Sequence, residues 1–247
     1  MRISFALLLL VAAVSASAAA DDVAAPADPR AAIAAKFPGS KPEQVKPSPV
    51  KGIFQIEMGG ETAYVSADGK FLFSGDLYDI DSRTNLTEVA RTGARSKALA
   101  KLDERDMIIF SPAAAKHTIT VFTDVDCCYC RKLHSEIEQL TKLGVRVRYM
   151  AYPRSGPGTE DWKKMEQVWC SKDRKDAITK AKQGEAIKVS TCGATPVGKQ
   201  FELGEQLGVR GTPAIFTPSG DYIGGYLPPN EMVKQLEQLE KVAAQAK

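Results

Sequence analysis

Long apolar segments are missing from this chain after its first twenty residues, and histidine is scarce, with two residues in 247. A membrane-spanning helix needs about 18 or more consecutive apolar residues, so the chain after residue 20 contains no candidate for one. Two histidines and a single CxxC spacing argue against a tetrahedral zinc site. The formal net charge is only +3, and aromatic residues do not interleave with basic clusters. We therefore expect no nucleic-acid partner.

The first twenty residues have the pattern of a secretory signal peptide. Arg2 precedes an apolar run from Ile3 to Val14, and Ala16-Ser17-Ala18 is a small-residue cleavage site. The apolar run is too short to span a bilayer. We expect segment 1–20 to be removed on export. Export would bring the five cysteines into an oxidising compartment, where disulfide pairing is expected.

The stretch from 118 to 134 changes from a strand pattern to a helix pattern at one point. Residues 118–125 are mostly β-branched or aromatic, and the run breaks at Asp126. A helical period follows, with apolar positions at Cys130, Leu133, Ile137 and Leu140. Cys127 is therefore expected where a strand ends and a helix begins.

This position favours redox chemistry at Cys127. A helix N-terminus has unpaired N–H groups and partial positive charge, which stabilise a thiolate. Arg131 and Lys132 add cationic charge. Cys130 lies about one helical turn further on, where it could attack a mixed disulfide formed by Cys127. The pattern predicts Cys127 as the exposed nucleophile with a low pKa and Cys130 as the resolving thiol.

Other interpretations of these cysteines remain. A CxxC pair can be half of a zinc site or a buried structural disulfide. The three thiols at 127, 128 and 130 could also hold a soft ion such as Cu(I), which would make the chain a metal-binding or chaperone module.

A second motif lies about 80 residues after the CxxC pair, at 208–213, Gly-Val-Arg-Gly-Thr-Pro. Proline cannot donate to a β-ladder and so marks a strand start, and X-Pro is the usual place for a cis peptide. We expect a cis bond between Thr212 and Pro213. A Thr-Pro entering a strand at this distance from a CxxC resembles the cis-proline loop of the thioredoxin fold.

Residues 21–83 predict a small α+β unit. A short helical run is followed by strands near 53–56, 63–66 and 71–73, with hairpin signals at Gly59-Gly60 and Asp68-Gly69. A unit of this size buries little surface on its own, so pairing with a second copy would stabilise it. The helix expected over 86–102 has a thin apolar stripe and a candidate cap in Thr87, which is typical of a linker spanning 84–106.

Residues 107–247 hold the redox unit, a strand at 145–149, a helical block at 160–207 and a final strand and helix. The helical block contains Cys170 and Cys192. A disulfide between them would close a loop of about 22 residues, worth roughly 3 kcal/mol in the loop-entropy model. We assign this pair a structural role, the alternative being a second redox pair. His117 is expected at the surface or a sheet edge. His134 is expected on a helix surface, with proton transfer to the redox pair as the alternative.

The motifs together resemble the periplasmic thiol:disulfide interchange proteins of the DsbC type. The resemblance covers nearly the whole chain after the signal. It rests on residues 122–134 (Phe-Thr-Asp-Val-Asp-Cys-Cys-Tyr-Cys-Arg-Lys-Leu-His), 147–154 (Val-Arg-Tyr-Met-Ala-Tyr-Pro-Arg), 169–170 (Trp-Cys), 208–213, 225–229 (Gly-Tyr-Leu-Pro-Pro), 47–49 (Pro-Ser-Pro), 68–70 (Asp-Gly-Lys) and 76–79 (Asp-Leu-Tyr-Asp).

The resemblance implies an α+β protein with an N-terminal homodimerisation domain (21–83), a linker helix (84–106) and a thioredoxin fold with a helical insertion (107–247). It implies a disulfide isomerase and reductase that also binds unfolded exported proteins, uses no cofactor, and receives electrons from a membrane thiol reductase of the DsbD type. Cys127 and Cys130 would be catalytic, and Tyr129, Thr212 and Pro213 would contact substrate. A monomeric thiol oxidase, or a DsbG-like reductase of sulfenylated cysteines, is the alternative within the redox class.

One position departs from that family, which usually has Cys-Gly-Tyr-Cys where this chain has Cys128 in place of glycine. A bond between adjacent cysteines strains the peptide that joins them, and residues two apart point to different faces of a helix. In the oxidised protein we expect Cys127–Cys130 and Cys170–Cys192 bonds, with Cys128 as the odd free thiol.

Overall fold

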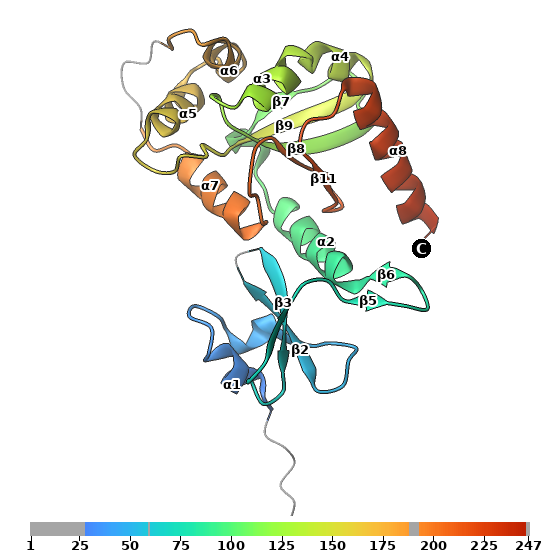
Figure 1. Cartoon of the computed structure of the whole chain (residues 1–247). Helices are drawn as coiled ribbons and strands as arrows, with labels where there is room; N and C mark the ends of the chain where they lie inside the picture. Colours follow the sequence, from blue (N-terminus) through green and yellow to red (C-terminus); the bar gives the residue numbers. More distant parts are fainter. Residues whose placement is uncertain (1–27, 59, 188–192, 246–247) are drawn as a thin grey trace, which may run out of the picture.

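A computed structural model describes residues 28–58, 60–187 and 193–245. The predicted signal peptide, Gly59 of the predicted hairpin and Cys192 lie outside these ranges. Figure 1 shows an N-terminal unit and a larger C-terminal unit, with helix α2 between them. Across the described residues, no helix is long and apolar enough to cross a bilayer.

The N-terminal unit is a four-stranded antiparallel sheet with one short helix against it. Its strands follow one another in the order β1-β2-β3-β4, as expected when tight turns join neighbouring strands. Ile33 of the helix packs on Val45, Ile56 and Val65 of the sheet, and this small cluster is the core of the unit. The elements are α1 (Arg30–Ala34), a 3-10 turn (Pro42–Gln44), β1 (Val45–Pro47), β2 (Ile53–Met58), β3 (Glu61–Ser66) and β4 (Leu72–Ser74).

Strand β4 forms one edge of this sheet and carries exposed apolar side chains. Phe71, Leu72 and Phe73 are between 52% and 62% exposed. An edge strand presents unpaired backbone groups that can pair with another strand. Apolar side chains on such an edge are typical of a surface that a partner covers.

Helix α2 (Leu86–Leu99) connects the two units, as expected, although its predicted cap was wrong. The side chain of Asn85 accepts a hydrogen bond from the Glu88 backbone N–H at 2.9 Å. Thr87 is buried instead, with its hydroxyl 2.6 Å from the Tyr64 hydroxyl and 2.8 Å from the Leu77 backbone nitrogen. The hydroxyl ties the helix to β3, which the local sequence could not indicate. A hairpin of β5 (Tyr78–Asp79) and β6 (Thr84–Asn85) precedes the helix.

The C-terminal unit is built on a five-stranded sheet in the order β11-β10-β8-β9-β7. Only the β8–β9 pair is parallel. The largely buried central strands form a continuous core with the helices packed on them. The strands are β7 (Ile108–Phe110), β8 (His117–Thr123), β9 (Val145–Ala151), β10 (Ala214–Phe216) and β11 (Tyr222–Gly224).

In the described part of this unit, six helices pack around the sheet, and three of them form the expected helical insertion between β9 and β10. Within the insertion, α6 packs on α3 and β7, and α7 packs on β9. The insertion is therefore part of the same core as the CxxC helix. The helices are α3 (Cys128–Ser135), α4 (Ile137–Lys142), α5 (Glu160–Cys170), α6 (Arg174–Gln183), α7 (Val197–Gln206) and α8 (Pro229–Gln245).

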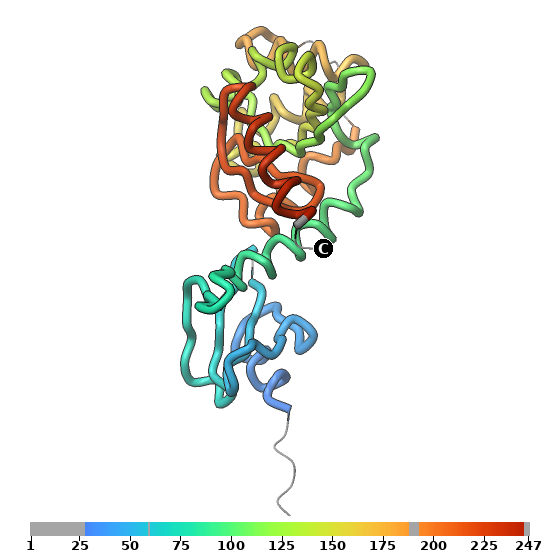
Figure 2. The backbone as a smooth tube through the Cα atoms, turned by 90° about the vertical axis from the view of Figure 1, so that its right-hand side faces the viewer, coloured from blue at the N-terminus to red at the C-terminus, as the bar shows by residue number. Residues whose placement is uncertain are grey.

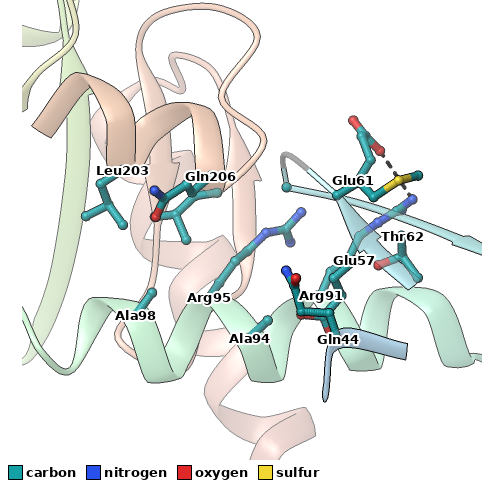
Figure 3. Close-up of a pocket in the computed structure, with 13 residues that line it drawn as sticks. Gln44, Glu57, Glu61, Thr62, Arg91, Ala94, Arg95, Ala98, Leu203 and Gln206 are labelled. Carbon is teal, nitrogen blue, oxygen red and sulfur yellow. Dashed lines mark ion pairs between the residues drawn. The ribbon is translucent and has the colours of Figure 1, made fainter. Parts of the chain in front are cut away.

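The two units meet at a narrow contact beside α2. A Cβ added to Gly60 would lie 2.2 Å from the backbone nitrogen of Gly208, so the two chain segments touch with no side chain between them. Glu61 pairs with Arg91 of α2 and with Arg210 of the C-terminal unit, both at 3.5 Å. Figure 3 shows the cavity of about 380 Å³ beside this contact, lined mainly by β2, β3, α2 and α7. In Figure 2 the connecting helix is the green segment between the two units.

Helix α7 is held close to Tyr152 by a glycine. A Cβ at Gly204 would lie 2.5 Å from the Tyr152 ring, whereas a Cβ at Gly198 on the same helix meets nothing nearer than 3.9 Å. We expect Gly204→Ala to lower the free energy of unfolding by roughly 1–3 kcal/mol, since the helix must move to accommodate a methyl group. Gly198→Ala is the matched control and should leave it unchanged or raise it by up to about 1 kcal/mol.

Urea unfolding of both variants measures the difference. If Gly204→Ala were as stable as Gly198→Ala, the close packing of α7 on Tyr152 would be wrong.

Candidate active site

Cys127 lies at the predicted junction between a strand and a helix. Strand β8 ends at Thr123, and α3 begins at Cys128 with Cys127 as its extended N-cap residue. The Cys127 carbonyl accepts the first helical hydrogen bond, from the Arg131 N–H at 3.0 Å. The Cys127 side chain therefore lies at the positive end of the helix.

The surroundings of Cys127 lower the pKa of its thiol to about 5. The largest cause is a hydrogen bond from the Cys130 thiol, followed by Thr212, the Cys130 backbone N–H and the positive charge of Arg154, while burial opposes them. A thiol with this pKa is almost entirely thiolate at neutral pH. Cys127 is therefore charged and ready to attack a disulfide without a separate base.

Cys130 has the opposite character. It is buried, and burial is the main cause that raises the pKa of its thiol well above its usual range. The same hydrogen bond that stabilises the Cys127 thiolate holds the proton on Cys130. The geometry thus separates the two thiols into a ready nucleophile and a protonated neighbour.

The expectation that Cys127 is exposed was wrong, because the residue is only 3% exposed. The segment before β10 covers it, and in its protonated form the Cys127 thiol donates a hydrogen bond to the Thr212 carbonyl at 3.1 Å. The exposed thiol is Cys128, and Cys127, Cys128 and Cys130 are all free in this structure. Reactivity at this site therefore comes from the low pKa and not from wide exposure.

The bond between Thr212 and Pro213 is cis, which confirms the prediction from the Gly-Thr-Pro motif. Strand β10 begins at the next residue and pairs antiparallel with β8, which carries the loop to the CxxC pair. With the Cys127 thiol donating to the Thr212 carbonyl, the buried Thr212 hydroxyl has no hydrogen-bond partner. Once Cys127 is a thiolate, that hydroxyl is a donor available to it.

Tyr129 is an exposed aromatic residue beside the thiols. Its ring stacks on Tyr226, with centroids 6.2 Å apart, and the Tyr226 hydroxyl donates to Glu136 at 2.8 Å. The pair makes a flat aromatic surface on α3 next to the reactive cysteine. Tyr226 belongs to the 225–229 motif, but no local pattern places it beside Tyr129, because the end of β11 approaches α3 only in the folded chain.

Two charged residues near the thiols were also missed. The buried Asp124 carboxylate accepts hydrogen bonds from the Arg154 side chain at 2.9 Å and backbone at 3.2 Å. This ion pair holds a guanidinium where its charge favours the Cys127 thiolate. The available signal was the acid-rich loop before the CxxC and the arginine just after β9.

Both histidine predictions were wrong, since both rings are buried. His134 lies 3.2 Å from the Tyr149 hydroxyl and 2.9 Å from the Thr179 hydroxyl. Burial, with help from the charge of Lys182, lowers the pKa of His134 to about 4, so the ring is neutral at neutral pH. His117 pairs with Glu240 at 2.8 Å, because α8 covers the start of β8.

Cys170 is disulfide-bonded. Cys192 lies outside the described residues, so the predicted Cys170–Cys192 pairing stays a prediction. The described residues contain no cluster of three or more histidine, cysteine and acidic side chains arranged to hold a metal ion.

The rates at which Cys127 and Cys130 are alkylated should depend on pH in very different ways. We expect iodoacetamide to modify Cys127 with a midpoint near pH 5, following its thiolate, and to leave Cys130 almost unmodified up to neutral pH. Thr212→Val removes the hydroxyl donor. It should raise the midpoint by about one to two pH units, since a hydrogen bond to a charged group is worth roughly 1.5–3 kcal/mol and one pKa unit is about 1.4 kcal/mol.

Peptide mapping by mass spectrometry assigns the modified cysteine, and Cys128→Ser removes the exposed thiol from the measurement. Faster labelling of Cys130 than of Cys127 at mildly acidic pH would reverse the assignment.

Known families match both units of the chain. A family model described as a thioredoxin-like domain matches residues 104–240, and one described as the disulfide bond isomerase protein N-terminal domain matches residues 16–88. The thiol:disulfide interchange protein DsbC of Escherichia coli K12 is 34% identical over 247 residues, covering 99% of both chains. DsbC of Haemophilus influenzae is 39% identical over 242 residues, covering 96% of this chain and 99% of the relative. The chain therefore belongs to the DsbC family of thiol:disulfide interchange proteins, with the N-terminal domain of that family joined to a thioredoxin-like domain.

Proposed function

We propose that this protein is a periplasmic disulfide isomerase that rearranges incorrect disulfides in exported proteins, with Cys127 as nucleophile and Cys130 as resolving thiol. The observation that carries the proposal is the separation of the two pKa values at one helix N-terminus. To begin exchange, the enzyme needs one cysteine in the thiolate form. To keep the mixed disulfide from being resolved too early, it needs a second cysteine that keeps its proton.

The reaction follows from thiol–disulfide exchange. The Cys127 thiolate attacks a sulfur of the substrate disulfide, which forms a mixed disulfide and releases the other substrate sulfur as a thiolate. If a second substrate thiolate attacks the mixed disulfide, Cys127 is restored and the substrate is isomerised. If Cys130 attacks, the Cys127–Cys130 bond forms and the substrate is reduced by two electrons. The raised pKa of Cys130 slows the second route and so favours isomerisation.

Tyr129, Thr212 and Pro213 are the proposed substrate contacts. The exposed stack of Tyr129 on Tyr226 offers apolar surface to an unfolded segment. Thr212 lies beside the Cys127 sulfur, so a chain bound along this loop would bring its disulfide to the nucleophile.

A homodimer held by residues 21–83 is the proposed assembly. Support comes from the exposed apolar edge at Phe71, Leu72 and Phe73, together with the small core of this unit. The linker (84–106) would then place two thioredoxin-like domains (107–247) around a shared space for unfolded chains. Export by segment 1–20 and reduction by a membrane thiol reductase of the DsbD type complete the proposal.

Cysteine variants test the catalytic assignment in the refolding of scrambled ribonuclease. Cys127→Ser should reduce the isomerase rate to the uncatalysed background, since no mixed disulfide can begin. Cys130→Ser should accumulate mixed disulfides with ribonuclease, visible on non-reducing gels, because internal resolution is lost. Trapped complexes with Cys127→Ser, or full isomerase activity in that variant, would contradict the assignment.

A charged residue on the β4 edge tests the assembly. We expect the full chain to sediment as a dimer at micromolar concentration and Phe73→Asp as a monomer, because burying an unpaired carboxylate costs several kcal/mol. The monomer should still reduce small disulfides but lose most of its isomerase activity. Val242→Asp, on an equally exposed apolar residue of α8, is the control and should stay dimeric. A wild-type monomer would end this proposal.

A further inference from the structure

Lys182 is a buried cation, and none of the exchange steps at Cys127 and Cys130 assigns it a role. It lies on the core face of α6 with Ala177, Ile178 and Ala181 and is only 4% exposed. Its ammonium donates hydrogen bonds to the Thr123 hydroxyl at 2.8 Å and the Asp124 carbonyl at 3.2 Å. Both partners are neutral oxygens, and a buried charge without a directly bonded opposite charge is costly. A cost of this kind inside a reactive site points to function.

Thr123 connects this ammonium to the resolving cysteine. The Thr123 hydroxyl that accepts from Lys182 also lies next to Cys130, where its hydrogen bond to the sulfur favours the thiolate and lowers the pKa of the Cys130 thiol. A hydroxyl can donate one hydrogen bond and accept others at the same time. The three side chains therefore form a continuous path for a proton from Cys130 through Thr123 to Lys182.

We propose that Lys182 is the base that takes the Cys130 thiol proton, through the Thr123 hydroxyl, when the mixed disulfide on Cys127 is resolved. This inference rests on the proposed roles of Cys127 and Cys130. The Cys130 thiol passes its proton to Thr123 while the Thr123 hydroxyl proton passes to the neutral Lys182 amine, which leaves a Cys130 thiolate and a Lys182 ammonium. The Cys130 sulfur then attacks the Cys127 sulfur. The Cys127–Cys130 bond forms, the bond to the substrate breaks, and the substrate sulfur leaves as a thiolate that takes up a proton.

The charge on Cys127 sets the time at which Lys182 can act. Burial lowers the pKa of Lys182 to about 8, while negative charge on Asp124 and Cys127, and on Cys130 when it loses its proton, raises it. In the mixed disulfide, Cys127 carries no charge, so one of the charges that raise the pKa of Lys182 is removed and the pKa falls. A larger fraction of the amine is therefore neutral, and able to act as a base, once the substrate is attached.

The groups around Lys182 agree with this sequence of events. A cavity of about 340 Å³ between α3 and α6 is lined in part by Lys182 and provides a route for its proton to water. Helix α5, which also packs on α6, contributes the apolar residues Met165, Val168 and Trp169 to the core. The titratable and charged groups that act on Lys182 are Cys127, Cys130, Arg131 and His134 at the start and along α3, Asp124 after β8, and Tyr149 of β9, whose ring centroid is 5.7 Å from the ammonium.

Stopped-flow reaction of the reduced full chain with equimolar Ellman's reagent separates the two steps. All variants carry Cys128→Ser so that the exposed thiol does not interfere. Attack by Cys127 releases one chromophore in a fast phase, and resolution by Cys130 releases the second in a unimolecular slow phase. We expect Lys182→Met to slow the second phase on the order of 100-fold at pH 7, as for loss of a general base, and to change the first less than about threefold.

Three further variants make the role specific. Lys182→Arg keeps the charge but cannot give up its proton, and should be as slow as Lys182→Met. Lys180→Met makes the same change at an exposed lysine of the same helix and should match the parent. In the parent, the slow phase should level off by about pH 8, whereas in Lys182→Met it should keep rising with pH. Thr123→Val removes the relay hydroxyl and should slow the same phase. It takes the place of Lys182→Met in the test if that variant does not fold.

Several results would overturn the proposal. An unchanged slow phase in Lys182→Met and Thr123→Val would remove the base. A parent-like rate in Lys182→Arg would leave only an effect of charge, and equal slowing of both phases would leave only a structural effect. A fast phase that persists in Cys127→Ser would overturn the catalytic assignment itself, which is distinct from failure of the slow phase alone.

Discussion

The hydrogen bond from the Cys130 thiol to the Cys127 sulfur is the contact on which the chemistry of this fold depends. It exists because a central strand ends just before the pair and a helix begins between its members, which sets the two side chains about one turn apart. The bond lowers one pKa and raises the other, so a single contact defines both chemical roles. The segment at Thr212 adds a second partner to the same sulfur and limits access to it.

The helical insertion belongs to the active site as much as the CxxC helix does. Helix α5 supplies Lys164, which pairs with Asp126 at 2.9 Å in the loop before Cys127. Helix α6 supplies Lys182 behind Cys130 and Thr179 beside His134. A thioredoxin-like sheet with a CxxC helix provides the reactive sulfurs, and the insertion adds the positive charges of Lys164 and Lys182 near them.

The parts of this architecture that the sequence predicts are those with a local pattern. The strand-to-helix change at Cys127 and the Thr-Pro entry into β10 each depend on a few neighbouring residues, and both are confirmed. The roles of Thr87 and His134 depend on β3 and α6, which are distant in sequence, and those predictions failed. Lys182 was visible in principle as a lysine among Ala177, Ile178 and Ala181 on one helix face, but only the fold shows that this face meets Cys130.

The contact of Gly60 with Gly208 determines how closely the two units approach each other at this point. Backbone against backbone allows the units to approach more closely than any pair of side chains would, and a β-carbon at position 60 would be a wedge that pushes them apart. Both glycines have positive φ angles, so other residues would also strain the chain there. The spacing between the catalytic unit and the N-terminal sheet is therefore set in part by two glycines that take no part in the chemistry.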